Sequence, residues 1–462
     1  MRLIITILLF TIASNGLLAQ NEYVTVKEIT LEGNKRTKTK IALREMDFEV
    51  GDTISTTNVM RRIERNHRLL MNADLFNQVE INITDWSDGQ LKLNIKVVED
   101  WYLFPLIVVS FADRNFNVWW VEQNRALNRV NLGLYLIHTN FTGRKDYFKA
   151  VAQIGYLQGL NLYYSRPYLN KAQTIGVLGN IFYTRSHDVG YRTKENVLEF
   201  HREDDEYLLR RFYLDGGITY RPENFAKHQL MLNYRDYGTT ETVTALNPDF
   251  FLDGATRLQY LALDYQYIYD KRDFSRYPMK GYFIQANVLK EGFGVFNEIN
   301  SLYIGATYGK YWKFGRFSTG GVVRGRLGLI NQKQPFYNSR ALGYFEDFIR
   351  GYEYYVIDGQ DYVFGKAFTR FELLNKEFNW GKFMLIKAFK KMPLRLYLKA
   401  YTDHGYVHTP FHNEENSLTN TYLRSGGLGL DIVMYHDYVY SIEYSVNHLN
   451  EGGIYLHYKV SF

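Results

Sequence analysis

The sequence predicts an all-β transmembrane barrel of about 16 antiparallel strands, preceded by one small α+β domain. Tyr and Phe are abundant, with 40 and 31 copies among the 462 residues. From Trp101 onward, short segments alternate apolar and polar residues and are separated by Gly-rich or Asn-rich turns. No later segment is apolar for the ~20 residues that a membrane-spanning helix needs. A chain of this kind crosses a bilayer only as a closed barrel, because lipid cannot satisfy unpaired backbone groups.

Residues 1–19 are expected to be a secretory signal peptide. Arg2 supplies the positive charge, Leu3–Ala13 the apolar core and Ala19 the small residue for cleavage. The apolar run is shorter than the ~20 residues that span a bilayer, which favours cleavage over a membrane anchor. The chain contains no cysteine, so disulfides, thiolate metal sites and a lipidated cysteine are excluded.

Residues 22–100 are expected to form the small domain. Its first strand carries the apolar residues Val24, Val26, Ile29 and Leu31. A helix follows over 37–46, and a longer one begins near residue 56 or 57. Two strands, over 79–83 and 91–97, are then joined by a turn at 88–89. The order is strand, helix, helix, strand, strand.

Residues 101–462 are expected to form the barrel. The alternating segments predict strands that start near residues 103, 130, 146, 159, 173, 206, 226, 256, 279, 298, 316, 361, 394, 422, 438 and 453. Residues 191–202 fit either a further strand or part of a long loop. The last strand places Ile454, Leu456, Tyr458, Val460 and Phe462 on one face, because side chains alternate with a period of two.

Charged residues on the opposite face of such strands are expected to point into the lumen. Asp403 shares a face with Arg395 and Lys399, while Leu394, Leu396 and Leu398 occupy the other face. On a neighbouring strand, Glu372 is expected to point inward as well.

The small domain resembles a POTRA domain, the polypeptide-transport-associated module. The resemblance rests on Ile29 and Leu31 before Gly33-Asn34, then Gly51-Asp52, Asp74-Leu75-Phe76 and Val97-Val98-Glu99. It implies that the domain binds extended client proteins by adding a strand to the edge of its sheet. That edge is assigned to the strand of Val24, Val26, Ile29 and Leu31. The alternative is a domain that only spaces or orients the barrel.

The barrel resembles the BamA-like superfamily of outer-membrane insertases and translocases. Three segments carry the resemblance: 348–352 with Asp358-Gly359, 401–405, and 269–273 with Pro278 and Gly281. It implies a loop that folds into the lumen, with the tip motif Ile349, Arg350, Gly351 and Tyr352, and a strand motif of Tyr401, Asp403 and Gly405. The C-terminal residues Tyr458, Val460 and Phe462 resemble the signal that the barrel-assembly machinery reads.

The tip arginine needs a carboxylate partner inside the barrel, because a desolvated guanidinium without one is costly. We therefore predict that Arg350 pairs with Asp403, Glu372 or both, which would lock the loop. The general insertase of the superfamily carries several POTRA domains and this chain has one, so a scaffold role for several accessory lipoproteins is in doubt.

The leading functional hypothesis is outer-membrane protein assembly or translocation, with client capture by the POTRA domain and transfer at the seam between the strands near Leu103 and Tyr455. Pro105 would weaken pairing at that seam. The alternatives are secretion of a dedicated exoprotein and a passive pore.

No Gly-x-Ser-x-Gly or His-Glu-x-x-His segment occurs, so we expect no catalytic residue, metal or cofactor. The net charge of +6 is dispersed, so no nucleic-acid partner is expected. The expected partners are outer-membrane lipids, unfolded or extended client proteins, and accessory periplasmic or outer-membrane proteins. The expected location is a Gram-negative-type outer membrane, with the POTRA domain in the periplasm.

Overall fold

The computed structural model describes residues 23–111, 113, 115–296, 299–344, 347–381, 390–411, 414–435 and 438–459. The expected signal peptide, and Val460 and Phe462 of the C-terminal signal, lie outside these residues. The chain divides between Glu99 and Asp100 into two compact units, and the short segment Arg36–Lys38 groups with the second.

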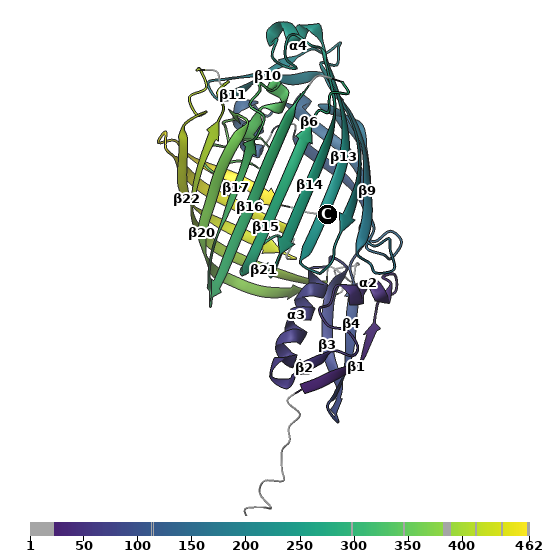
Figure 1. Cartoon of the computed structure of the whole chain (residues 1–462). Coiled ribbons are helices and arrows are strands. Elements are labelled where there is room, and N and C mark those ends of the chain that lie inside the picture. Colours follow the sequence, from purple (N-terminus) through teal and green to yellow (C-terminus); the bar gives the residue numbers. More distant parts are fainter. Residues whose placement is uncertain are drawn as a thin grey trace, which may run out of the picture. The chain divides into compact units, whose positions relative to one another are not determined.

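The first unit is a four-stranded sheet with two helices (Figure 1). The sheet has the order β2-β1-β4-β3, in which β1 and β4 are parallel and the other pairs antiparallel. Helix α3 buries Val59, Ile63 and Leu70 from its apolar stripe. The elements are β1 (Tyr23–Glu32), α2 (Thr39–Arg44), β2 (Thr53–Ser55), α3 (Val59–Met71), β3 (Phe76–Ser87) and β4 (Gln90–Glu99).

The prediction that β1 is a free edge of this sheet is wrong for the first half of the strand. The start of β1 pairs with β2, and Val26 exchanges backbone hydrogen bonds with Gly51 and Asp52. Val24 and Val26 are core residues, and a register shift after Val26 leaves Ile29 and Leu31 half-buried. The three-residue strand β2 covers this part of β1, and such a short segment has no periodic pattern. The outer strand on the other side of the sheet is β3.

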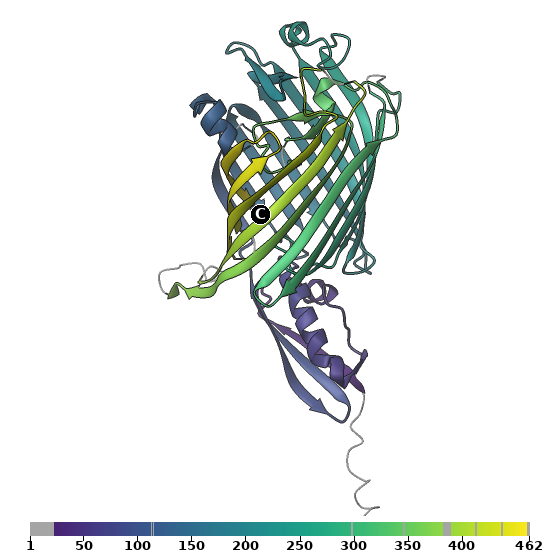
Figure 2. The same ribbon diagram turned by 90° about the vertical axis from the view of Figure 1, so that its left-hand side faces the viewer.

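The second unit is a single curved sheet of 16 strands, which we call the wall (Figures 1 and 2). The strands follow one another in chain order from β5 at one end of the sheet to β24 at the other, and neighbouring strands are antiparallel. Every predicted strand is present and starts within three residues of its expected position. The strands are β5 (Leu103–Phe111), β6 (Val130–His138), β7 (Tyr147–Gly155), β8 (Leu157–Arg166), β9 (Ile175–Ser186), β12 (Leu209–Tyr220), β13 (Ala226–Thr239), β14 (Arg257–Asp270), β15 (Gly281–Glu291), β16 (Ser301–Phe314), β17 (Phe317–Gly328), β20 (Asp361–Asn379), β21 (Lys391–His408), β22 (Tyr422–Met434), β23 (Tyr438–Asn447) and β24 (Gly452–Lys459).

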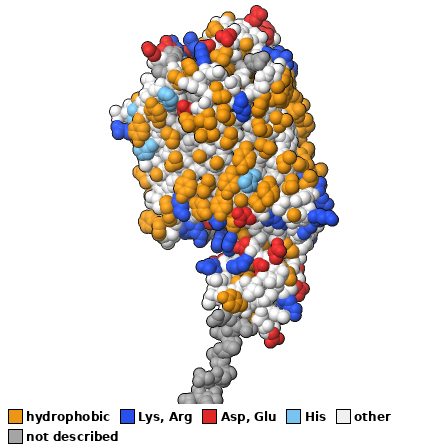
Figure 3. Space-filling model, viewed as in Figure 1, with side chains coloured by type: hydrophobic (Ala, Val, Ile, Leu, Met, Phe, Trp, Pro, Cys, Tyr) orange, Lys and Arg blue, Asp and Glu red, His pale blue; other side chains and the backbone are white. Residues whose placement is uncertain are grey.

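The outer surface of this wall is apolar. Hydrophobic side chains form a band over its strands (Figure 3). In β24, Ile454, Leu456 and Tyr458 are exposed, whereas Tyr455 between them is buried. Alternation of this kind is typical of a transmembrane barrel, whose outward residues face lipid while the inward ones face a polar lumen. The predicted fold class is therefore confirmed.

Shorter elements lie outside the wall. Residues 191–202, left open between strand and loop, belong to a separate hairpin of β10 (Asp188–Lys194) and β11 (Val197–Arg202). The loop between β17 and β20 contains the paired strands β18 (Arg340–Leu342) and β19 (Ile357–Asp358). The remaining helix is α4 (Glu241–Leu246). In the described part of the chain, no helix has both the length and the hydropathy needed to cross a bilayer.

Candidate functional site

The loop between β17 and β20 brings Arg350 against Asp403 of β21. The Arg350 Nε donates to Asp403 Oδ2 over 2.8 Å, and its backbone N–H donates to the same oxygen over 3.1 Å. A second guanidinium nitrogen binds the other carboxylate oxygen, so the pair is bidentate. Both side chains are buried, at 8% and 0% exposure. The guanidinium also lies over the Tyr401 ring, 3.7 Å from its centroid.

The second carboxylate that binds Arg350 is that of Glu443 of β23. The prediction that Glu372 pairs with Arg350 is wrong. Arg350 Nη1 donates to Glu443 Oε1 over 3.2 Å. Glu372 instead accepts a hydrogen bond from the Tyr397 hydroxyl. In the ladder between β20 and β21, Asp403 is opposite Lys366, six residues before Glu372. Six strand residues span roughly 20 Å, which places Glu372 out of reach.

Glu443 extends the contact into a chain of buried charges. Lys399 Nζ lies 2.8 Å from Glu443 and 2.6 Å from Asp431 of β22. Asp431 also accepts hydrogen bonds from the hydroxyls of Tyr277 and Ser441, at 2.7 and 2.6 Å. Each buried carboxylate thus faces a cation and further donors, the condition under which buried ion pairs are tolerated.

The loop is tied to the last strand as well. His457 of β24 lies between two carboxylates, with Nδ1 2.6 Å from Glu443 and Nε2 3.4 Å from Glu353 of the loop. The backbone N–H of Gly351 donates to Glu353 over 2.7 Å. The loop therefore contacts the lumenal face of β21, β23 and β24 through charged groups.

Two glycines provide the space for the loop tip. Gly351 has φ +86°, a conformation that L side chains rarely adopt, and a Cβ there would lie 3.3 Å from the Cβ atoms of Ser425 and Ser445. At Gly405, a Cβ would lie only 2.3 Å from Cδ1 of Ile349. Ile349 and Tyr352 are each only 2% exposed, so the four residues of the tip motif and Gly405 form one packed unit.

Sequence reasoning missed Glu443 and Asp431. Glu443 lies between the outward residues Ile442 and Tyr444 on β23, so alternation alone places it inward. A search for acidic residues on the inward face of every strand would have found it.

The seam of the barrel lies between β5 and β24. These strands end the sheet on its two sides, and no ladder joins them within the described residues. Asn117, which follows β5, occupies this edge instead. Its side-chain Nδ2 donates to the carbonyl of Ile454 over 2.7 Å, and its Oδ1 accepts from the N–H of Leu456 over 3.3 Å. These are two backbone groups that a neighbouring strand would use.

We call residues 115–122 the seam segment. It includes the helical turn η2 (Val118–Glu122), and Figure 2 shows it in dark blue beside the yellow β24. Trp119 stacks on Phe111, the last residue of β5, with ring centroids 4.1 Å apart. Asn115 donates to the carbonyl of Glu353 over 2.8 Å. The seam segment thus contacts β5, β24 and the lumenal loop.

Comparisons with known proteins agree with this architecture. The family model of the POTRA domain, described as a surface antigen variable number repeat, matches residues 24–100. Among solved structures, the chain is similar to BamA from Haemophilus ducreyi in a form that lacks POTRA domains 1–3. Identity is 15% and the TM-score 0.51, over 94% of this chain and 83% of that one.

The chain is also similar to CdiB from Escherichia coli, at 10% identity and a TM-score of 0.58 over 95% of this chain and 76% of that one. CdiB from Acinetobacter baumannii matches at 10% identity with a TM-score of 0.50, over 96% of this chain and 74% of that one. No curated protein sequence matches the chain. Residues 24–100 thus match the family model of the POTRA domain, and the chain as a whole shares the fold of these solved structures, a small α+β domain followed by a 16-stranded barrel.

Proposed function

We propose that this protein inserts or translocates client proteins at the outer membrane, and that a client strand pairs with β24 at the seam. The observation that carries the proposal is the edge of β24, where the Asn117 side chain binds Ile454 and Leu456 and no strand pairs with them among the residues that the structure describes. An unpaired strand edge is a template for a further strand.

The free energy of hydrogen bonding favours a client strand that displaces the Asn117 side chain from the edge of β24. A typical hydrogen bond contributes about 0.5–1.5 kcal/mol net, so the two bonds of Asn117 are a weak closure. An incoming strand along the eight residues of β24 would form several such bonds and would bury side chains as well. On the other side of the seam, Pro105 removes one N–H from β5.

The lumen supports this function over a passive pore. Arg350 of the loop forms buried ion pairs with Asp403 of β21 and Glu443 of β23, and Glu353 of the loop lies 3.4 Å from the half-buried His457 of β24. We expect a loop fixed in this way to obstruct conduction through the lumen. Of the two possible routes for a client, the lumen and the seam between β5 and β24, the seam is closed by the weaker contacts.

The POTRA domain would capture extended clients by strand addition. The outer strand β3 provides twelve residues for this purpose, Phe76–Ser87. This assignment replaces the first half of β1 and leaves the mode of binding unchanged. The proposal assigns no catalytic step to any residue.

The test uses reversible closure of the seam. The chain has no cysteine, so the variant Asn117→Cys/Leu456→Cys can be joined by a reducible thiol crosslinker. The full chain, in liposomes, is assayed for its effect on the folding rate of a client barrel. We expect crosslinking to abolish the acceleration and reduction to restore it.

The matched control is Leu134→Cys/Ala152→Cys, a facing pair within the intact ladder of β6 and β7. Its crosslinking should leave the acceleration unchanged. Equal activity of the open and crosslinked seam would overturn the proposal. A passive pore would instead show steady conductance that increases after deletion of residues 344–358, with no effect on client folding.

A further inference from the structure

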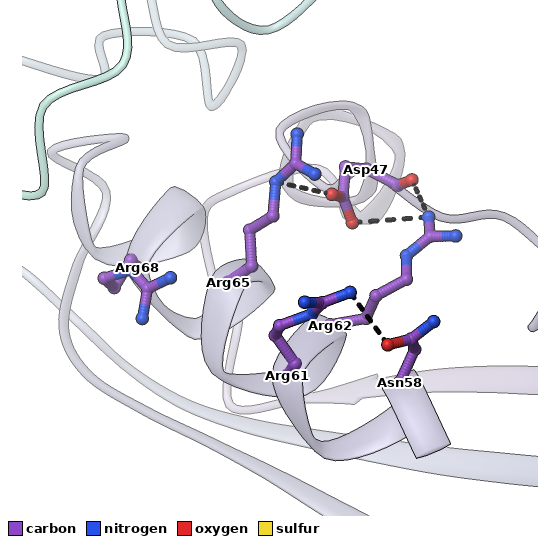
Figure 4. Close-up of a pocket in the computed structure, with 6 residues that line it drawn as sticks. All are labelled: Asp47, Asn58, Arg61, Arg62, Arg65 and Arg68. Carbon is purple, nitrogen blue, oxygen red and sulfur yellow. Dashed lines mark hydrogen bonds and ion pairs between the residues drawn. The ribbon is translucent and has the colours of Figure 1, made fainter. Parts of the chain in front are cut away.

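One face of helix α3 in the POTRA domain carries four arginines. Arg61, Arg65 and Arg68 follow the spacing i, i+4, i+7, and Arg62 lies beside them. With Asp47 and Asn58 they line a groove of about 540 Å³ (Figure 4). The opposite face of α3 packs in the domain core, so this row is the solvent side of the helix.

Part of this groove is held in place by a buried scaffold. Asn66 is fully buried, and its side chain accepts from the Asp47 N–H over 2.7 Å and donates to the Asp47 carboxylate over 2.5 Å. Asp47 in turn binds Arg65 Nε over 2.7 Å and also binds Arg62. Two guanidiniums are thereby oriented before any ligand arrives, which lowers the entropy cost of binding.

The groove has an excess of positive charge. Four arginines line it with the carboxylate of Asp47, and a second carboxylate, that of Asp52, lies 3.7 Å from Arg62. Arg61 donates to the neutral Asn58 side chain over 2.8 Å, and no carboxylate pairs with Arg61 or Arg68 within the described residues. The groove therefore matches a ligand with more than one negative charge.

The chemistry of the row favours phosphate. All four cations of α3 are arginines, with no lysine. The guanidinium is a planar fork that binds phosphate oxygens in pairs, whereas an ammonium acts as a point charge. Phosphate groups occur in phospholipid headgroups and as free ions. Only residues 100–102 separate β4 from the membrane-spanning β5, a linker of ~10 Å, so a lipid surface is present at high effective concentration.

We propose that the groove of Arg61, Arg62, Arg65 and Arg68 binds the phosphate of an anionic phospholipid headgroup. This site is separate from the seam and does not depend on the function proposed for it. Membrane binding would then give the POTRA domain a second anchor besides its linker.

The test is arginine labelling of the full chain in nanodiscs. Phenylglyoxal modification of Arg61, Arg65 and Arg68 is followed by mass spectrometry in phosphatidylcholine and in an equal mixture with phosphatidylglycerol. Each arginine near an anionic surface contributes about a fivefold effect, so all three should react about fivefold more slowly in the mixture. Arg44, outside the groove, should react equally in both.

Two variants make the test specific to the groove. In Arg61→Gln/Arg68→Gln, which leaves the Asp47 scaffold intact, Arg65 should lose its protection by phosphatidylglycerol. In Lys27→Gln/Lys96→Gln, which removes two charges elsewhere in the same domain, Arg65 should stay protected.

Three results would overturn the proposal. The first is equal labelling in both nanodiscs. The second is equal protection by inorganic phosphate in phosphatidylcholine alone, which would make free phosphate the ligand. The third is protection by an oligo-aspartate peptide but not by phosphatidylglycerol, which would assign the groove to an acidic protein segment.

Discussion

The side chain of Asn117 takes the place of a strand at the edge of β24, where it donates to the carbonyl of Ile454 over 2.7 Å. A residue that follows the first strand of the wall thus closes the last strand. Within the described residues, one amide group and no ladder joins the two end strands of the barrel, so the seam is closed by fewer backbone hydrogen bonds than any other strand pair of the sheet.

Asn117→Ala should expose the β24 edge. The N–H of Leu456 loses its acceptor, so its hydrogen exchange should become about fivefold faster, the equivalent of ~1 kcal/mol. Exchange is measured on the full chain in nanodiscs. Asn161→Ala, which removes a side-chain amide from β8, is the control and should leave Leu456 unchanged. Unaltered exchange of Leu456 in Asn117→Ala would show that the amide does not close the edge.

Arg350→Glu should release the lumenal loop. It leaves Asp403 and Glu443 buried beside a third negative charge, and removal of one partner from a buried pair costs roughly 3–5 kcal/mol. We expect a lower unfolding midpoint of the barrel in denaturant and loss of client assembly. Arg257→Glu, at an exposed ion pair with Asp236, should change stability by about 1 kcal/mol or less. Wild-type stability of Arg350→Glu would contradict the locked loop.

Glu443→Gln should destabilise the barrel more than Glu372→Gln. Glu443 contacts Arg350, Lys399 and His457, and its neutralisation leaves these groups with less compensating charge. Glu372 contacts only the Tyr397 hydroxyl through its side chain among the described interactions. Both unfolding midpoints are measured in the same detergent. An equal effect of the two substitutions would mean that the charge chain is not a stabilising unit.

Gly405→Ala should be destabilising through Ile349. The added Cβ would lie 2.3 Å from Ile349 Cδ1, and overpacking of a filled site typically costs about 1–3 kcal/mol. Ile349→Ala removes the clashing atom, so Gly405→Ala should cost at least ~1 kcal/mol less in that background. The double-mutant cycle is measured by denaturant unfolding. Additive effects of the two changes would show that the residues do not pack together.

Much of the barrel follows from the sequence alone. The strands were predicted from their period-two alternation, which depends only on neighbouring residues in one segment. The same alternation places Asp403 inward and Ile454 outward. The small domain was recognisable because its turns and helices also have local signals, such as the Asp88-Gly89 turn with both φ values positive.

Which residues contact one another across the barrel was decided by the tertiary structure. Glu372 and Asp403 both point inward, but the register of β20 against β21 separates them, and the sheet places Glu443 of β23 beside Arg350. The short β2 covers the start of β1, and Asn117 meets a strand more than 300 residues later in the chain. The sequence by itself determined which face each side chain takes, because alternation is local. Only the folded wall decided which residues meet, because strand register and the closure of the seam depend on contacts between distant segments.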